Sequence, residues 1–328
     1  MSDGLEFTGE RFVPGTPGEI WYEHWHRYHF AAALVTGRDV LDVACGEGYG
    51  SALLARTARH VVGADIAPAV IGHARARYGA ATNLEFRRAD CKILPFPDAS
   101  FDVVVSFETI EHIGGQETFL DEVRRVLRPE GFLVLSCPNP IEYTNKRGVI
   151  NEFHVHEPER TELAALLAPR FTHTAWYGQR PGFFSVVWPE HGEARGEIFE
   201  VSESTPDLPM PGHGRPMYFI VIAASSQRAI AGVGPRLSVL ADHNEWIYRD
   251  YESVTRACLA LTHERGLRQA AQADTEMRLA QAQAERDALR AELAQAQHEG
   301  TRRAGLRWWL ALPMRRLRNA LAGRAPRD

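Results

Sequence analysis

The stretch VLDVACGEGYG, residues 40–50, decides the fold class of this chain of 328 residues. An apolar run with the pattern of a buried strand carries an acid, Asp42, and leads into a turn that contains Gly46 and Gly48. Glycine lets the backbone take positive φ angles or approach a ligand closely. A helical pattern follows, and a strand–turn–helix unit of this kind is typical of α/β folds that bind a ligand at the turn.

The turn departs from the loop that binds the pyrophosphate of a dinucleotide. That loop has the pattern G-x-G-x-x-G, whereas here the first position is Ala44 and an acid, Glu47, lies within the turn. A negative side chain at this point disfavours a pyrophosphate. It is compatible with a ligand that carries a cationic sulfonium, an ammonium group and an uncharged ribose.

Strand-like and helical patterns alternate around this turn. The runs predicted as strands are 39–44, 60–65, 84–90, 101–108, 131–138, 171–177 and 217–224. Helical patterns cover 51–58, 68–78, 116–127 and about 160–168. Such alternation indicates right-handed βαβ units. The sequence therefore predicts an α/β fold: a Rossmann-like, doubly wound, mostly parallel seven-stranded sheet, followed by a long C-terminal helix or coiled coil.

Composition divides the chain into a core domain and flanking segments. The stretch 178–216 is rich in Gly and Pro, and since long insertions in compact domains are more often functional than idle, we expect it to cover a substrate. A surface excursion without function is the alternative. The predicted segments are an N-terminal cap, 1–38; the core domain, 39–225; a linker or helix, 226–258; a helical or coiled-coil segment, 259–300; and a basic amphipathic tail, 301–328.

The bulk properties indicate a globular protein of a reducing compartment. The four cysteines, which are Cys45, Cys91, Cys137 and Cys258, lie far apart, and this spacing argues against a zinc ribbon or a disulfide scaffold. The N-terminus lacks the pattern of a signal peptide, and no apolar run reaches the roughly 18 residues of a membrane-spanning helix. We expect a cytoplasmic location, peripheral to the inner face of the membrane if the tail binds there.

Charge is distributed unevenly. The net charge is −5, but residues 301–328 hold eight arginines and one acid, so this tail carries +7 and the rest of the chain −12. An acidic body is a poor surface for nucleic acid, which we exclude as a partner. A basic amphipathic helix that carries tryptophan suits a membrane surface or a partner such as a glycosyltransferase, and both interpretations stay open.

The segment before the tail has a weak coiled-coil pattern. Spacings of three and four relate Leu279, Ala282, Arg286, Leu289, Leu293 and Ala296. Alanines and an arginine weaken this seam. A homodimer through 259–300 and a single solvated helix both stay open. In the tail, Leu306, Trp309, Leu310 and Leu312 are expected on one face, and Pro313 is expected to kink or split the helix.

Acids at the ends of the other predicted strands complete the candidate cofactor site. Asp65 ends the second strand, where a carboxylate can accept from both ribose hydroxyls. Asp90 and Cys91 end the third strand and can meet an adenine amino group. Phe107 ends the fourth strand. All of these lie at the carboxyl ends of parallel strands, where open α/β sheets bind ligands.

These residues resemble class I S-adenosylmethionine-dependent methyltransferases over about residues 5–225, and the resemblance implies a methyltransferase enzyme. The motifs TGERFVPG, EHWHRY (23–28), SFETIEHI (106–113), SCPNPIEYTN (136–145) and NEFHVHE (151–157) are similar to a bacterial subgroup that is often encoded with glycan-assembly genes. The resemblance places Asp42, Ala44, Gly46 and Gly48 near the methionine moiety, Asp65 and Ile66 near the ribose, Asp90 and Cys91 near the adenine, and Arg27 and Tyr28 over the cofactor. Ala44 stands where most of the superfamily has glycine, a mild departure in size.

Two routes to methyl transfer are open. In one, His112 or His154, with Glu111 beside them, serves as the base that takes the acceptor proton. In the other, a divalent metal such as Mg²⁺ or Mn²⁺ polarises the acceptor hydroxyl. The pattern E-x-x-E-H followed by a distant histidine is similar to small-RNA 3′-terminal ribose methyltransferases, which use a metal, and implies the ligands Glu108, Glu111, His112 and His154.

The subgroup resemblance implies O-methylation of a sugar hydroxyl on a glycan or sugar-linked intermediate. One alternative is a small-molecule O-methyltransferase that acts on a quinone precursor or a polyketide. The other is a membrane-tethered assembly protein whose methyltransferase domain is vestigial. The chain outside the cofactor half does not separate these hypotheses.

Overall fold

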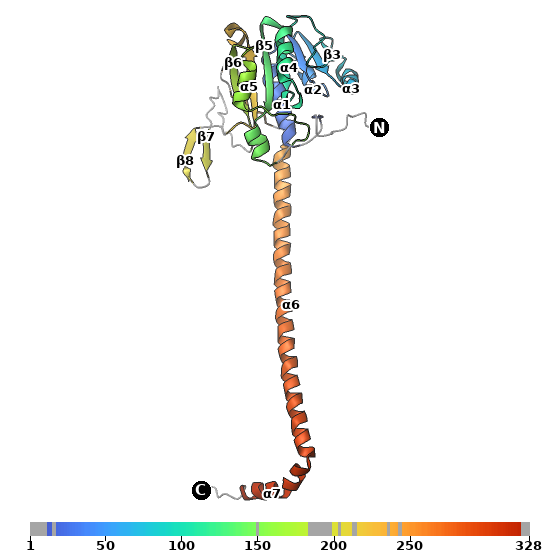
Figure 1. Ribbon diagram of the computed structural model, residues 1–328, viewed down its shortest axis with the longest axis vertical. Helices are drawn as coiled ribbons and strands as arrows, with labels where there is room; N and C mark the ends of the chain where they lie inside the picture. Colours follow the sequence, from blue (N-terminus) through green and yellow to red (C-terminus); the bar gives the residue numbers. More distant parts are fainter. Residues whose placement is uncertain are drawn as a thin grey trace. The chain divides into compact units, whose positions relative to one another are not determined.

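The computed structural model describes residues 12–14, 18–148, 151–182, 199–202, 205–211, 215–234, 237–241 and 245–322. The chain forms two units, Met1–Ile247 and Tyr248–Asp328 (Figure 1). The first unit contains the helices α1 Glu19–Ala32, α2 Tyr49–Leu54, α3 Pro68–Tyr78, α4 Gln116–Val126 and α5 Arg160–Leu167, with the short helical turns η1 Ile110–His112, η2 Ile141–Asn145 and η3 Gln227–Ile230.

A seven-stranded sheet forms the centre of the first unit. Its strand order is β3-β2-β1-β4-β5-β9-β6, and β9 is antiparallel to both of its neighbours while the other pairs are parallel. The predicted Rossmann-like, mostly parallel fold is therefore confirmed. The strands are β1 Asp39–Val43, β2 His60–Asp65, β3 Leu84–Arg88, β4 Phe101–Phe107, β5 Leu127–Pro138, β6 His173–Gln179 and β9 Tyr218–Ala224.

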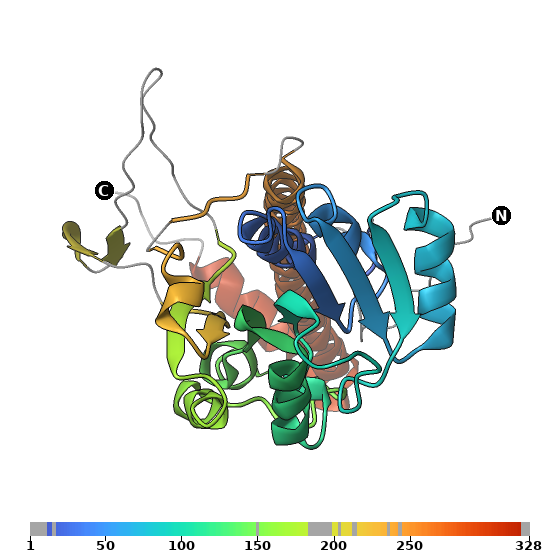
Figure 2. The same cartoon turned by 90° about the horizontal axis from the view of Figure 1, so that it is seen from above.

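Each face of the sheet has its own apolar core, because successive side chains of a strand point to opposite faces. In β1, Val40 packs with the core that contains residues of α1, α2 and α3, while Leu41 packs with the core that contains residues of α4 and α5. Figure 2 shows α1 in blue and α4 in green on opposite sides of the strands. Strands that are apolar along nearly their whole length need helices on both faces of the sheet, and this sheet has them.

Element boundaries differ from the prediction at β5. The strand begins at Leu127 rather than at residue 131, because Leu127 already pairs with Phe101 before the register shifts. Pro129 and Gly131, which suggest a turn in the sequence, lie within this irregular stretch. β3 ends two residues earlier than predicted, at Arg88.

The predicted substrate-covering insertion lies mostly outside the described residues. Within it, the backbone of β7 Phe199–Ser202 pairs antiparallel with β8 Thr205–Pro211. Whether the segment 178–216 covers a substrate stays a prediction.

The second unit is almost entirely helical. α6 runs without interruption over Trp246–Ala304, 59 residues with no buried side chain, and α7 spans Leu306–Ala322. Pro313 lies inside α7 and the break falls at Gly305, so the helix is not split at Pro313, whereas a kink there stays a prediction. Proline removes one backbone hydrogen bond, but glycine frees the chain to leave the helix. The coiled-coil pairing of 259–300 stays a prediction. Among the helices that the structure describes, none is at once long and apolar enough to cross a bilayer.

Candidate functional site

The turn after β1 has a left-handed backbone at three positions. Ala44, Gly46 and Gly48 have φ angles of 59°, 55° and 96°. A Cβ at Gly48 would lie 2.9 Å from both Ala74 and Phe86, so glycine is needed there for space as well as conformation. Ala44 is small enough for its position, but an L-residue is strained at positive φ. Glycine therefore suits position 44 better than alanine because of its backbone conformation, although the two residues differ little in size.

Asp42 lies beneath this turn and is fully buried. Its carboxylate accepts from Ser51 Oγ at 2.6 Å and from the Tyr28 hydroxyl at 3.2 Å. Burial raises the pKa of Asp42 to about 7. Tyr28 in turn packs edge-on against Phe107 at 5.1 Å between ring centres. The predicted cofactor residues Tyr28, Asp42 and Phe107 are thus in one packed group.

Asp65, the last residue of β2, connects this strand to the turn that follows β1. Its two oxygens accept from the backbone N–H groups of Gly46, at 3.1 Å, and Ala67, at 2.9 Å. Asp90 similarly accepts from the Lys92 N–H at 2.9 Å. Each carboxylate oxygen has a second lone pair, so these contacts leave acceptor capacity. Ile66 is exposed and Cys91 is half-buried at the same edge of the sheet.

Glu47 has a structural role that its sequence position did not reveal. The carboxylate is 1% exposed and accepts from Tyr78 at 2.8 Å, with His73 Nε2 at 2.8 Å and Arg77 Nε at 3.3 Å. Partners on α3 therefore offset the negative charge of the turn. Because this charge is paired, Glu47 disfavours a pyrophosphate less than the sequence suggested.

A cavity opens at the carboxyl ends of β1 and β4, between α1, η1 and the start of β9. Open α/β sheets bind ligands at this edge. The cavity is lined on the α1 side by Ile20, Glu23, His24, Arg27 and Tyr28; by Phe12 and by Ala44, Cys45, Gly46, Glu47 and Tyr49 at the turn; and by Phe107, Glu108, Glu111, His112, Tyr143, Asn151, His154 and Tyr218.

Arg27 is buried in the wall of this cavity with only part of its hydrogen-bonding capacity used. Its Nη1 donates to Gln179 Oε1 at 3.1 Å and lies 3.4 Å from Glu108 Oε1. The guanidinium also stacks over the Tyr218 ring at 4.7 Å. Its Nε and Nη2 atoms are buried without a hydrogen-bond partner. Unsatisfied buried donors are costly, so they indicate a place for an acceptor on a ligand.

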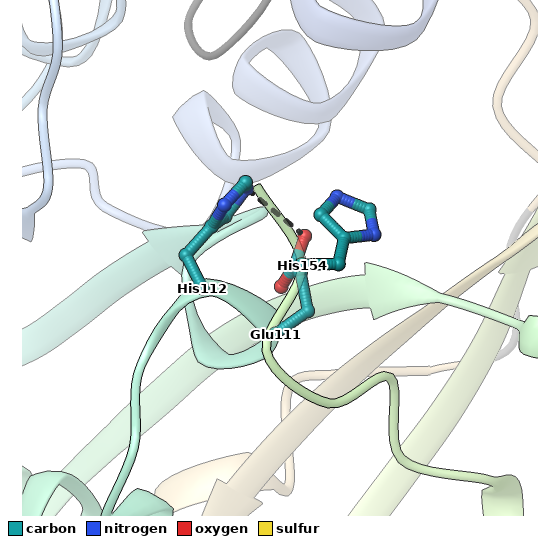
Figure 3. A group of neighbouring side chains, drawn as sticks. All are labelled: Glu111, His112 and His154. Carbon is teal, nitrogen blue, oxygen red and sulfur yellow. Dashed lines mark ion pairs between the residues drawn. The ribbon is translucent and has the colours of Figure 1, made fainter. Parts of the chain in front are cut away.

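Glu111 is the second buried group whose polar atoms lack a partner. Both carboxylate oxygens are buried without a hydrogen bond, and burial, together with the charge of Glu108, raises the pKa of Glu111 well above its usual value. His112 Nε2 lies 3.9 Å from Glu111 Oε1. Figure 3 shows the side chains of Glu111, His112 and His154 next to one another, with the contact between His112 and Glu111 dashed. One ligand atom from each of the three lies within 4.8 Å of the others.

The two histidines are oriented by groups from one loop. His112 Nδ1 lies 3.0 Å from the carbonyl oxygen of Phe153. A carbonyl only accepts, so Nδ1 carries the proton and the lone pair is on Nε2, which faces Glu111. His154 Nδ1 lies 2.5 Å from Glu157, whose carboxylate also accepts from Thr144. A histidine held by a carboxylate is fixed in tautomer and orientation.

The structure does not bring Glu108, the fourth predicted metal ligand, into this group. Its carboxylate accepts from Ser136 Oγ at 2.6 Å and faces Arg27. His156 also points elsewhere, since it is half-exposed and contacts Glu162 at 2.6 Å.

Sequence analysis assigned no role to Glu23, Tyr143, Glu157, Gln179 or Tyr218. Three of these lie in motifs that it quoted, and Glu157 follows His154 at the spacing from which a carboxylate can hold an imidazole. Gln179 and Tyr218 come from β6 and β9, far from Arg27 in sequence, and no local pattern links them to it.

The chain is similar to known methyltransferases. Residues 41–135 match a family described as a methyltransferase domain. A probable S-adenosylmethionine-dependent methyltransferase of Mycolicibacterium smegmatis is 42% identical over 51% of this chain and 65% of its own length. A similarly named protein of Mycobacterium tuberculosis is 42% identical over 50% of this chain and 60% of its own. The match therefore spans less than two thirds of either relative.

A further relative carries a more specific name. A fatty-acid O-methyltransferase of Mycolicibacterium smegmatis is 41% identical over 34% of this chain and 42% of its own length. A solved S-adenosylmethionine-dependent methyltransferase of Aquifex aeolicus is 18% identical, covers 60% of this chain and 86% of its own, and has a TM-score of 0.40.

Proposed function

Since this chain carries a class I S-adenosylmethionine-dependent methyltransferase domain, we propose that it transfers the methyl group of S-adenosylmethionine to a hydroxyl oxygen, and that this hydroxyl belongs to a sugar. The oriented imidazole of His112 is the observation that carries the proposal. The remaining residues of the cavity bind the two substrates and hold them in line.

The residues present fit the cofactor. S-adenosylmethionine supplies an electrophilic methyl group on a sulfonium. Nε and Nη2 of Arg27, which lack partners, would donate to its carboxylate, as a guanidinium fork does. At Gly46 the turn leaves room for close approach, since no atom lies within 4 Å of where a Cβ would be. Asp65 would accept from the ribose hydroxyls, and Asp90 with Cys91 would contact the adenine.

His112 is placed to remove the acceptor proton. Because Nδ1–H donates to the Phe153 carbonyl, the imidazole is held with Nε2 on the side of Glu111, and Nε2 is the atom that would take the acceptor proton. Loss of the proton raises the nucleophilicity of a hydroxyl oxygen as the new bond to the methyl carbon forms. Once protonated, the His112 imidazole would lie 3.9 Å from Glu111 and would favour the ionised form of that buried carboxyl group, whose pKa burial raises.

A sugar is favoured because the surroundings of His112 are polar. Glu111, Tyr143, Asn151 and His154 line the same part of the cavity. Several hydroxyls of one acceptor could hydrogen-bond there, whereas an acyl chain would leave these groups unpaired. Small-molecule O-methylation is the second candidate, and it is favoured by a relative named as a fatty-acid O-methyltransferase, which aligns over about a third of this chain.

A divalent metal such as Mn²⁺ is the alternative route, in which the Nε2 lone pair of His112 would bind the ion instead of taking the acceptor proton. Glu111, His112 and His154 offer one carboxylate and two imidazoles, and the Glu111 oxygens have no other partner. Donors on such an ion lie about 3–4 Å apart, so the most distant of the three groups would approach one another by about 1–2 Å. The metal would hold the acceptor oxygen and lower the pKa of its hydroxyl.

Two measurements on the purified full chain test the activity. Calorimetric titration with S-adenosylhomocysteine should show binding, and radiolabelled methyl should pass to nucleotide sugars rather than to fatty acids or quinones. A folded protein without affinity for S-adenosylhomocysteine would mean a vestigial domain and remove the proposal. Transfer to fatty acids or quinones alone would keep the activity and replace the acceptor.

Equilibrium dialysis against Mn²⁺, followed by elemental analysis, tests the metal. The wild type should retain one ion for each chain, His154→Gln should lose it, and the matched control His156→Gln should keep it. Full turnover after exhaustive chelation, with no ion bound, would leave His112 as the base without a metal.

A further inference from the structure

α7 is a helix whose charged residues are all basic. Arginines at 302, 303, 307, 315, 316 and 318 lie in or directly before it, and no Asp or Glu occurs between Glu299 and Asp328. Most protein surfaces intersperse the two signs of charge. A segment with one sign alone attracts a surface of the opposite sign.

The same helix carries large apolar side chains on one side. Trp309, Pro313 and Leu317 follow one another at intervals of four, and so do Leu310 and Met314. Since an α-helix turns once in 3.6 residues, these two rows lie next to each other. Leu312, which the sequence analysis put on this face, is off it.

These apolar side chains are exposed to solvent. Leu310 is 73%, Met314 77% and Leu317 66% exposed. Helical spacing puts Arg307 and Arg316 along the two borders of the apolar side, with Arg315 across from it. Arginines beside an apolar strip can bury their stems and keep the guanidinium at the level of phosphates.

We propose that α7 binds the surface of a membrane that contains anionic lipid, with its apolar side in the headgroup layer. The charge argues for this occupant: the arginines meet lipid phosphates while the apolar side meets acyl chains. An acidic protein partner would also match the charge. Lipid fits better because the apolar strip and the basic borders run along one helix without a polar interruption on the strip. The proposal is independent of the methyl acceptor.

Co-sedimentation of the full chain with vesicles tests it. One set of vesicles is phosphatidylglycerol and phosphatidylcholine in equal parts, and the other is phosphatidylcholine alone. The chain should sediment with the anionic set only, and added salt should release it. The double variant R307Q/R316Q, at the two borders of the apolar side, should lower the partition coefficient by about five-fold for each arginine.

Two further variants separate the apolar contribution from a general effect on the helix. Leu310→Gln with Leu317→Gln should abolish sedimentation, whereas Ala311→Gln, on the other side of α7, should bind as the wild type does. Far-ultraviolet circular dichroism and binding of S-adenosylhomocysteine should be the same for all of them. A wild-type chain that stays in solution with both vesicle sets, as it would if α7 bound only a protein partner, overturns the proposal. Equal binding by the L310Q/L317Q and A311Q variants also overturns it.

Discussion

Nη1 of Arg27 lies 3.4 Å from Oε1 of Glu108, so that the first helix is joined to the end of β4 across the wall of the cavity. The pair leaves the Nε and Nη2 atoms of Arg27 unused, and both oxygens of the second carboxyl group in this region, Glu111, have no hydrogen-bond partner. Buried polar groups that lack hydrogen-bond partners lie together at this end of the sheet. Such a group of atoms is typical of a site to which a ligand binds.

Arg27→Lys should weaken the binding of S-adenosylhomocysteine by about 10- to 100-fold. Lysine keeps the positive charge beside Glu108 but lacks the fork of donors, and losing a charge-assisted hydrogen bond costs about 1.5–3 kcal/mol. Calorimetric titration measures the change. Arg87→Lys, at an exposed position on β3, is the control and should leave the affinity unaltered. Equal affinities for the two variants would remove Arg27 from the cofactor site.

His112→Gln should lower turnover by about 100- to 10,000-fold, the usual contribution of a general base, without weakening S-adenosylhomocysteine. Glutamine keeps a polar side chain of similar length and cannot accept a proton. His156→Gln is a matched control, because His156 lies on the neighbouring loop but contacts Glu162 at the surface. Initial rates at saturating substrates give the turnover of the two variants. A similar loss of turnover in both would contradict the role of His112 as the base.

Stability should depend on pH through Glu23. Burial is the main cause that raises its pKa from 4.5 to about 7. The folded state therefore holds a proton that the unfolded state releases, so the stability contributed by Glu23 is complete below pH 4.5 and is lost as pH rises to 7.

Glu23→Gln removes this titration. Relative to the variant, the free energy of unfolding of the wild type should fall by about 3 kcal/mol between these two pH values. Urea denaturation at pH 4.5, 6 and 8 measures it. Parallel curves for wild type and variant would show that Glu23 titrates normally.

Ala44→Gly should raise the free energy of unfolding by about 0.5–1 kcal/mol, since relief of the left-handed conformation exceeds the entropy that glycine adds to the unfolded chain. Ala76→Gly, at an exposed position within α3, is the control and should lower stability by about 0.5–1 kcal/mol. Thermal denaturation of both variants shows whether each substitution raises or lowers the stability. Destabilisation by Ala44→Gly would mean that the methyl group of Ala44 contributes packing that outweighs the strain.

The sheet could be predicted well from the sequence, because each strand has a local pattern of apolar residues that identifies it. The runs from Asp39 to Val43 and from His60 to Asp65 are apolar, bounded by turns and separated by helical patterns. β5 was misjudged at its start because a register shift depends on pairing with Phe101. The sequence of one strand does not show which residues of a neighbouring strand it pairs with.

The candidate site was predicted in part, for a related reason. Glu111, His112 and His154 belong to short motifs, and the structure brings them together. The partners of Arg27 come from β6 and β9, and the orientation of Glu108 depends on Ser136 in β5. Contacts between distant strands follow from the strand order, which the sequence of any one element does not contain.

The loop that carries His154 is fastened to η1 by its backbone. The amides of Val155 and His156 both donate to the carbonyl oxygen of Glu111, at 2.8 and 3.1 Å. These bonds do not depend on which side chains the three residues carry. Reactive groups at positions 111, 112 and 154 could thus be exchanged while the frame that holds them persists, which makes this corner a place where new acceptor chemistry can evolve without a new fold.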